Sequence, residues 1–247
     1  MEERPCAVLL KFPGTNCDHE TARSLEAVGF VTELLPISAF KPEKLVGVSV
    51  VVLSGGFSYG DYVMAGRLAQ LVIEQKVGQT LEEFRDNGGY LLGICNGFQI
   101  LAHLGLLPAC TLIENASGRF QCHWATMDNR AADSPFLSRL PEKFELPLAN
   151  AEGRLVTSTP EEAAKYVESG AAALVYRDDV NGSFGRIAGL QDQTGRVFGL
   201  MPHPERFLHR SDHYDPDWRN DSGEDGDEER GSGYYLFRSL YEHITVS

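Results

Sequence analysis

The chain has 247 residues and a formal net charge of -13, because 35 acidic side chains outnumber 22 basic ones. Nucleic acids and anionic membranes are bound by clustered Lys and Arg, so neither is an expected partner. No run of eighteen apolar residues occurs, and the first residues lack the basic-then-apolar order of a signal peptide. These features predict a cytoplasmic protein with one large α/β domain over residues 1–247.

The five cysteines show no C-x-x-C spacing, since they stand at Cys6, Cys17, Cys95, Cys110 and Cys122. That spacing predicts neither a disulfide framework nor a metal site. Reduced thiols fit the expected cytoplasmic location.

Strands and helices alternate over the first hundred residues. We expect a strand at 6–12, a helix at 18–28, strands at 31–35 and 49–53, helices at 62–74 and 80–87, a strand at 89–94 and a helix at 96–104. This alternation is typical of an open, mostly parallel sheet with helices on both faces. In such sheets, sites form at the carboxyl ends of strands.

The second half is richer in strands, which we expect at 111–114, 120–127, 144–149, 172–176, 187–191 and 196–200, with helices at 160–168 and 234–243. Residues 211–230 hold nine acids against two arginines. This acidic segment is predicted to be a solvated, mobile loop.

Cys95 is the candidate nucleophile. It stands between Gly93 and Gly97 in "GICNGFQ", directly after a predicted strand and before a predicted helix. Small flanking residues permit the strained turn of a nucleophile elbow, which pushes the central side chain outward. The helix that follows directs its free N–H groups towards this side chain. The alternative is that Cys95 is buried packing at a strand end.

His203 is the candidate base. Pro202 and Pro204 stiffen its backbone in "GLMPHPER", and Glu205 can accept a hydrogen bond from one ring nitrogen. The other nitrogen would then face the thiol, which gives a Cys-His-Glu triad. An oxyanion hole needs N–H donors, for which we choose the amides of Asn96 and Gly56.

Simpler interpretations exist for each of these residues. His203 could merely end a strand, and the Gly55-Gly56 pair could be only a tight turn. Cys17 in "TNCDHE" is a rival thiol, although it lacks glycine flanks. A metal could bind in "HRSDHYD", through His209, Asp212 and His213, but a polar surface loop is the expected alternative.

The residues quoted above resemble those of the class I glutamine amidotransferases, which have a flavodoxin-like fold. Within them the resemblance is to the glutaminase subunits of phosphoribosylformylglycinamidine synthase. It rests on "LKFPGTNCDHET" (10–21), "LSGGFSYGDY" (53–62), "GICNGFQIL" (93–101), "NASGRFQCHW" (115–124) and "GLMPHPER" (199–206), and so spans most of the chain. The segments that contain Cys95 and His203 are typical of the whole family, and the other three segments are typical of the subfamily.

The resemblance implies that Cys95 attacks the side-chain amide of glutamine, that His203 protonates the departing ammonia, and that water hydrolyses the thioester. Gln99 is the position implied to bind substrate glutamine. The ammonia would pass to a large synthase subunit in purine biosynthesis, to which a small third subunit can be joined. No cofactor is implied on this chain. The resemblance implies that ATP and Mg²⁺ bind to the large subunit, and the lack of a G-x-x-x-x-G-K-[ST] loop in this chain agrees with that division.

The chain departs from the family in three places. Asn150-Ala151-Glu152-Gly153 replaces the usual His-Gly-Glu-Gly near the substrate, His123 stands where arginine is common, and the acidic segment lengthens the tail. Asparagine can still donate and accept hydrogen bonds, so function is expected to persist. The competing hypotheses are an amidotransferase subunit of another synthase, a cysteine hydrolase on the same fold, and a non-catalytic binding module.

Overall fold

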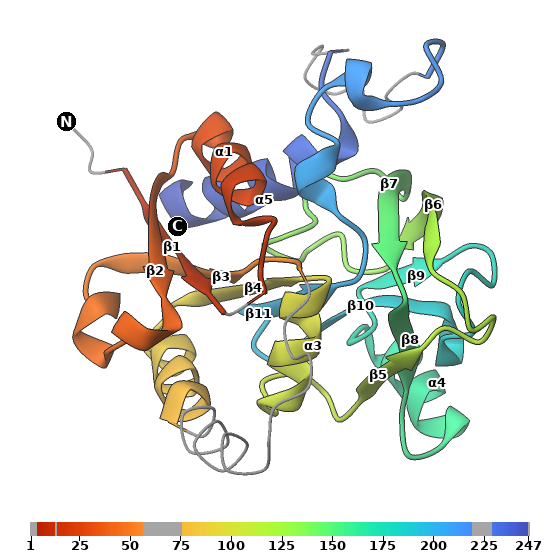
Figure 1. Ribbon diagram of the computed structural model, residues 1–247, viewed down its shortest axis with the longest axis horizontal. Helices are drawn as coiled ribbons and strands as arrows, with labels where there is room; N and C mark the ends of the chain where they lie inside the picture. Colours follow the sequence, from red (N-terminus) through yellow and green to blue (C-terminus); the bar gives the residue numbers. More distant parts are fainter. Residues whose placement is uncertain (1–3, 13, 57–75, 219–228, 247) are drawn as a thin grey trace.

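The computed structural model describes residues 4–12, 14–56, 76–218 and 229–246, and its centre is one nine-stranded sheet (Figure 1). The strand order is β2-β1-β3-β4-β11-β10-β9-β6-β7. The strands are β1 (Cys6–Lys11), β2 (Val31–Pro36), β3 (Val48–Leu53), β4 (Tyr90–Ile94), β6 (Gln121–Asn129), β7 (Lys143–Asn150), β9 (Leu174–Tyr176), β10 (Ile187–Gln191) and β11 (Val197–Leu200). A separate two-stranded ribbon pairs β5 (Thr111–Glu114) with β8 (Glu152–Val156).

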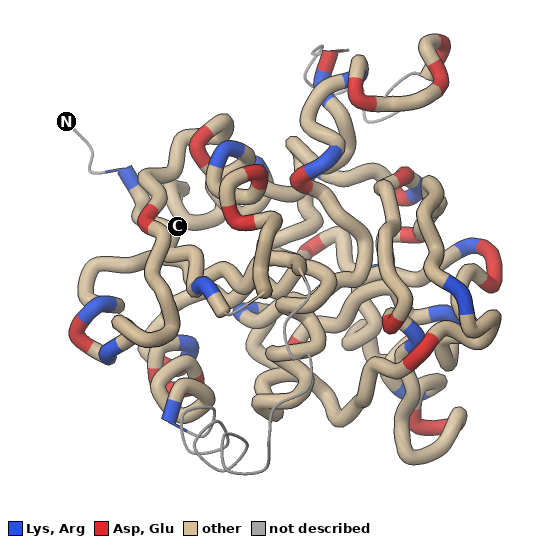
Figure 2. The backbone as a smooth tube through the Cα atoms, in the orientation of Figure 1, with Lys and Arg blue, Asp and Glu red and all other residues tan. Residues whose placement is uncertain are grey.

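The strand pairing changes once across the sheet, from parallel to antiparallel. From β2 to β11 each neighbouring pair is parallel, whereas β10, β9, β6 and β7 are joined by antiparallel pairs. The parallel strands β3, β4 and β11 contain no charged residue and are covered on both faces, as buried parallel strands require. In Figure 2 the charged residues gather on the surrounding helices and loops.

Helices cover the two faces of the parallel half. Helices α1 (Asp18–Val28) and α5 (Ser232–Val246) lie on one face, and α3 (Asn96–His103) lies on the other (Figure 1). The ring of Tyr241 in α5 lies edge-on to Phe30, just after α1, at 5.3 Å between centroids. Helix α4 (Pro160–Ser169) flanks the β5-β8 ribbon, and its N-cap is Thr159, whose hydroxyl accepts from Glu162 N–H.

The predicted α/β class with helices on both faces is confirmed, and α1, β5 and β10 have the predicted bounds. The helix predicted at 80–87 includes residues 76–86 of the described chain, so it covers residues before 80 that were not predicted. Strand β8 was not predicted, because Gly153 and Arg154 interrupt its apolar pattern. The helix predicted at 62–74 lies outside the described residues. In the part of the chain that is described, no helix has the length and apolarity to cross a membrane.

The prediction of a solvated loop at 211–230 fits six of the eight described residues at 211–218, which are exposed, but it does not fit His213. His213 is only 8% exposed, and its ring lies 4.3 Å from that of Trp124 and 5.4 Å from that of Trp218. Its Nε2 atom is 3.2 Å from a carboxylate oxygen of Glu145 on β7. The aromatic residues between the acids therefore anchor residues 211–218 to the sheet, while 219–228 lie outside the described residues.

Replacing His213 by Ala should lower the free energy of unfolding by roughly 2 kcal/mol or more, because a buried ring with aromatic and carboxylate contacts is lost. Asp217→Ala is the control, since Asp217 is exposed in the same segment and its loss should cost no more than about 0.5 kcal/mol. Denaturant titration measures both. Equal stabilities would mean that the segment is not anchored through His213.

Candidate active site

The candidate residues meet at the carboxyl ends of four neighbouring parallel strands. Cys17 follows β1, Gly55 follows β3, Cys95 follows β4 and His203 follows β11. A Cβ atom placed on Gly55 would lie 3.0 Å from His203 Cε1, 3.4 Å from Cys17 Sγ and 3.5 Å from Cys95 Cβ. The two cysteines and the imidazole therefore converge around Gly55, where a side chain would crowd them.

Cys95 sits on a strained elbow, as its glycine flanks predict. Its φ of 52° and ψ of -106° lie outside the regions that non-glycine residues favour. The amide of Cys95 donates to Leu200 O at 2.8 Å, and its carbonyl accepts from Gln99 N–H at 3.2 Å. The elbow is thus held by β11 on one side and by the first turn of α3 on the other.

The flanking glycines are required by close backbone contacts. A Cβ on Gly93 would lie 2.7 Å from the carbonyl oxygen of Gly97. One on Gly97 would collide with the carbonyl oxygen of Leu53 at the end of β3. The nucleophile elbow therefore depends on α3 packing directly against strand backbone.

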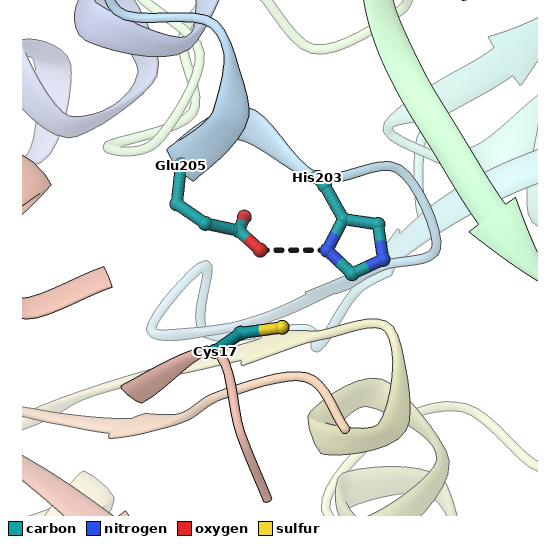
Figure 3. A group of neighbouring side chains, drawn as sticks. All are labelled: Cys17, His203 and Glu205. Atoms are coloured by element: carbon teal, nitrogen blue, oxygen red, sulfur yellow. Dashed lines mark hydrogen bonds and ion pairs between the residues drawn. The ribbon is translucent and has the colours of Figure 1, made fainter. Parts of the chain in front are cut away.

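His203 and Glu205 form a buried pair (Figure 3). His203 Nδ1 and Glu205 Oε1 are 2.6 Å apart, and the two residues are 2% and 4% exposed. The single-turn helix η4 (Pro204–Arg206) brings the carboxylate back to the ring, and the amide of His203 donates to Pro147 O at 2.8 Å. His203 Nε2 and Glu205 Oε2 have no hydrogen-bond partner among the described residues.

The pKa of His203 is raised well above its ordinary value by its surroundings. Burial alone would lower it, since it disfavours the charged ring, but the Glu205 carboxylate and the nearby Cys17 and Cys95 side chains outweigh that effect. Because Nδ1 faces Glu205, Nε2 is left for the thiol or the substrate. The pair can therefore hold and deliver a proton.

Two side chains near the nucleophile were not predicted as part of the site. Cys17 was named only as an alternative nucleophile, and Tyr176 was not named. Cys17, the rival thiol, is 2% exposed and lies beside the pair of His203 and Glu205 (Figure 3). Tyr176 at the end of β9 is fully buried with an unpartnered hydroxyl among the described atoms, and burial and then Cys95 raise its pKa. The position of Tyr176 at a strand end was the available signal.

The remaining predicted residues lie around the nucleophile. Asn96 is buried in the first turn of α3. Gly56 follows Gly55, pairs with Thr15 and has a φ of 150°. Gln99 faces the ribbon instead of open space, because its Nε2 donates to Glu152 O at 2.7 Å.

The replaced family segment is also close to the nucleophile. Cys95 Sγ lies 4.0 Å from the carbonyl oxygen of Ala149, the residue before Asn150. The side-chain amide of Asn150 is buried and unpartnered in the described structure.

The possible metal ligands His209, Asp212 and His213 do not converge on one point. His213 bonds Glu145, and Asp212 accepts from the amide of His209.

The comparisons with known proteins agree with this geometry. A family model for CobB/CobQ-like glutamine amidotransferase domains matches residues 4–244. The phosphoribosylformylglycinamidine synthase subunit PurQ of Dehalococcoides mccartyi is 37% identical over 246 residues, covering 93% of this chain and 94% of that protein. The chain belongs to the PurQ family of glutamine amidotransferases.

Two further members of the PurQ family extend the likeness. PurQ of Thermotoga maritima is 38% identical over 210 residues, covering 84% of this chain and 90% of that protein. In the structure of PurLQS from the same organism, one chain has a TM-score of 0.76 to this one at 32% identity, covering 98% of this chain and all of that one. The family and fold predicted from the motifs are therefore confirmed.

Gly97→Ala should destabilise the chain by roughly 2 kcal/mol or more, because α3 must move away from β3 to admit the methyl group. Gly78→Ala is the matched control in helix 76–86, where the new Cβ would make an ordinary contact with Leu104. That change should be neutral or stabilise by up to about 1 kcal/mol. Unfolding curves that coincide for the two variants would contradict the packing argument.

Glu205→Gln should lower the pKa of His203, because the carboxylate that favours the imidazolium is removed. A histidine with a raised folded pKa contributes stability that is complete below its unfolded value of about 6.5 and is lost as pH rises through the folded value. The stability advantage of the wild type over Glu205→Gln should therefore shrink as the pH rises through that range.

The imidazole resonances of His203 followed by NMR, and denaturant unfolding at several pH values, give the two readouts. An unchanged His203 titration in Glu205→Gln would mean that Glu205 does not set the protonation of the ring.

Proposed function

We propose that this chain hydrolyses glutamine to glutamate and ammonia as the glutaminase subunit of phosphoribosylformylglycinamidine synthase. The observation that carries the proposal is the convergence of the Cys95 elbow and the His203-Glu205 pair around Gly55. Membership of the PurQ family supports glutamine as the substrate.

The first half of the reaction forms a thioester. The sulfur of Cys95 attacks the side-chain carbonyl carbon of glutamine, and the negative charge develops on the carbonyl oxygen. His203, held as imidazolium by Glu205, gives its proton to the departing nitrogen, so ammonia leaves as a neutral molecule. The carbon-sulfur bond that forms replaces the carbon-nitrogen bond that breaks.

The second half releases glutamate. His203 is neutral after the first step and takes a proton from water, which then attacks the thioester carbon. The carbon-sulfur bond breaks and the thiolate of Cys95 is restored beside the imidazolium. One histidine thus serves first as acid and then as base, which requires the fixed orientation that Glu205 and the flanking prolines supply.

The oxyanion of both intermediates lies beside the backbone amides of Asn96 and Gly56. The first amide belongs to the first turn of α3 and the second to the glycine loop after β3. Gln99, on the same helix, helps to place the substrate beside the ribbon strand β8. Such donors stabilise developing charge best when they are held rigidly.

The ammonia is used by a separate, large synthase subunit that carries ATP and Mg²⁺, with a small third subunit completing the assembly. The absence of a phosphate loop in this sequence supports that division. The likeness to a chain of PurLQS from Thermotoga maritima supports assembly with partner subunits. We propose that this chain needs no cofactor of its own and works in the cytoplasm.

Cys95→Ala should lower glutamate release from glutamine at least about a thousandfold, because no nucleophile remains. The assay uses the purified chain alone and with a large synthase subunit, its nucleotide substrate and ATP. Cys122→Ala is the control, since Cys122 is exposed on β6 and should retain wild-type rates.

Wild-type activity in Cys95→Ala would overturn the mechanism. A wild-type chain that stays silent beside a synthase proven active with free ammonia would overturn the assignment to that synthase.

A further inference from the structure

We propose that Asn115 and Asn181 are positioning residues of the glutaminase, which together clamp the backbone of residues 150–153 beside the nucleophile. This role rests on the proposed function, because it requires glutamine to bind next to that segment. Each asparagine begins an Asn-x-Ser triplet, and the two are only 2% and 4% exposed. Their burial gives both triplets a role inside the protein.

Residues 150–153, here called the corner, lie where the chain leaves the main sheet after β7 and enters the ribbon at β8 (Figure 1). The carbonyl oxygen of Ala149, just before the corner, is 4.0 Å from Cys95 Sγ. Gln99 on α3 donates from its Nε2 atom to Glu152 O at 2.7 Å. The corner therefore borders both the nucleophile and the side chain that is proposed to place the substrate.

Asn115 holds most of the corner. Its Nδ2 atom donates to Asn150 O at 3.0 Å, and its amide donates to Ala151 O at 3.0 Å. Its Oδ1 atom accepts from Gly153 N–H at 3.2 Å. One buried residue thus fixes the backbone of the corner at its start, its middle and its end.

Asn181 supplies the bond that Asn115 does not make. Its Nδ2 atom donates to Gly153 O at 2.8 Å, and its Oδ1 atom accepts from the amide of Ser183 at 3.1 Å and from the hydroxyl at 2.7 Å. The two asparagines are also joined, since Ala116 N–H donates to Asn181 O at 3.0 Å.

Together with Gln99, the two asparagines satisfy every carbonyl from 150 to 153. A buried carbonyl that loses its partner costs more than the bond itself contributes. Removal of either asparagine should therefore displace the corner instead of leaving it in place with an unpaired group.

The side chains of the corner give it no comparable hold. The side-chain amide of Asn150 is 5% exposed, and neither its nitrogen nor its oxygen has a partner among the described atoms. Gly153 has no side chain, and a Cβ placed there would lie 2.4 Å from Asn150 Oδ1. The position of the corner relative to Cys95 therefore depends on the groups that bind its backbone.

The test measures kcat and KM for glutamine by glutamate release, with the purified full chain, a large synthase subunit, its nucleotide substrate and ATP. Asn181→Ala should raise KM at least about tenfold, because the displaced corner no longer borders the substrate correctly. The value of kcat should change less, since Cys95, His203 and Glu205 are not altered. Asn115→Ala should change KM in the same direction.

Asn129→Ala is the matched control. Asn129 is also buried, at 8% exposure, and its Nδ2 atom donates to Leu137 O at 3.1 Å and to Leu140 O at 3.2 Å. It lies at the opposite end of β6 from the residue that pairs with Asn150. This variant should lower the melting temperature by an amount similar to Asn181→Ala and leave KM unchanged.

Alkylation of Cys95 is a second readout that needs no turnover. A chloromethyl ketone analogue of glutamine reports how the substrate is placed, whereas iodoacetamide reports the thiol alone. At limiting concentration, Asn181→Ala should slow the reaction with the analogue at least about tenfold and leave the iodoacetamide rate unchanged. Asn181→Asp, which keeps the acceptor for Ser183 and loses the donor to Gly153, replaces the alanine variant if that variant fails to fold.

The outcomes separate this role from the proposed function. Unchanged KM and unchanged analogue labelling in the Asn115 and Asn181 variants of an active enzyme would overturn the clamp and leave the glutaminase intact. An equal rise of KM in Asn129→Ala, or loss of folding in every Asn115 and Asn181 variant, would show a structural role only and overturn it as well. A wild-type chain that neither hydrolyses glutamine beside an active synthase nor reacts selectively with the analogue would overturn the proposed function itself.

Discussion

The structure of the site depends on how closely α3 approaches the end of β3. Gly97 lies against the carbonyl of Leu53, at a distance that excludes any side chain. That contact fixes the start of α3, and the start of α3 fixes the turn in which Cys95 has a positive φ. A helix held even slightly further from the sheet would relax the turn, and the thiol would no longer meet His203.

The buried His203-Glu205 pair adds a second constraint, and it costs stability in isolation. Removing two ionisable groups from water is unfavourable unless their mutual attraction and hydrogen bonds offset the loss. Here one short bond joins them, while one further atom of each remains unpartnered. An arrangement selected for stability alone would satisfy those atoms. The ring nitrogen left unpartnered beside the nucleophile indicates that chemistry, and not stability, maintains the pair.

The sequence predicted those features that local chemistry determines. The elbow at Cys95, the His-Pro-Glu turn and the bounds of α1 follow from residues that are neighbours in the chain. The place of Cys17 beside the buried pair could not be predicted, because its neighbours His203 and Arg206 come from the opposite end of the sequence. Strand β8 was missed because its pairing with β5 compensates for Gly153 and Arg154. His213 was misjudged because the acids around it dominate the composition of the segment, and composition says nothing of which ring packs inward.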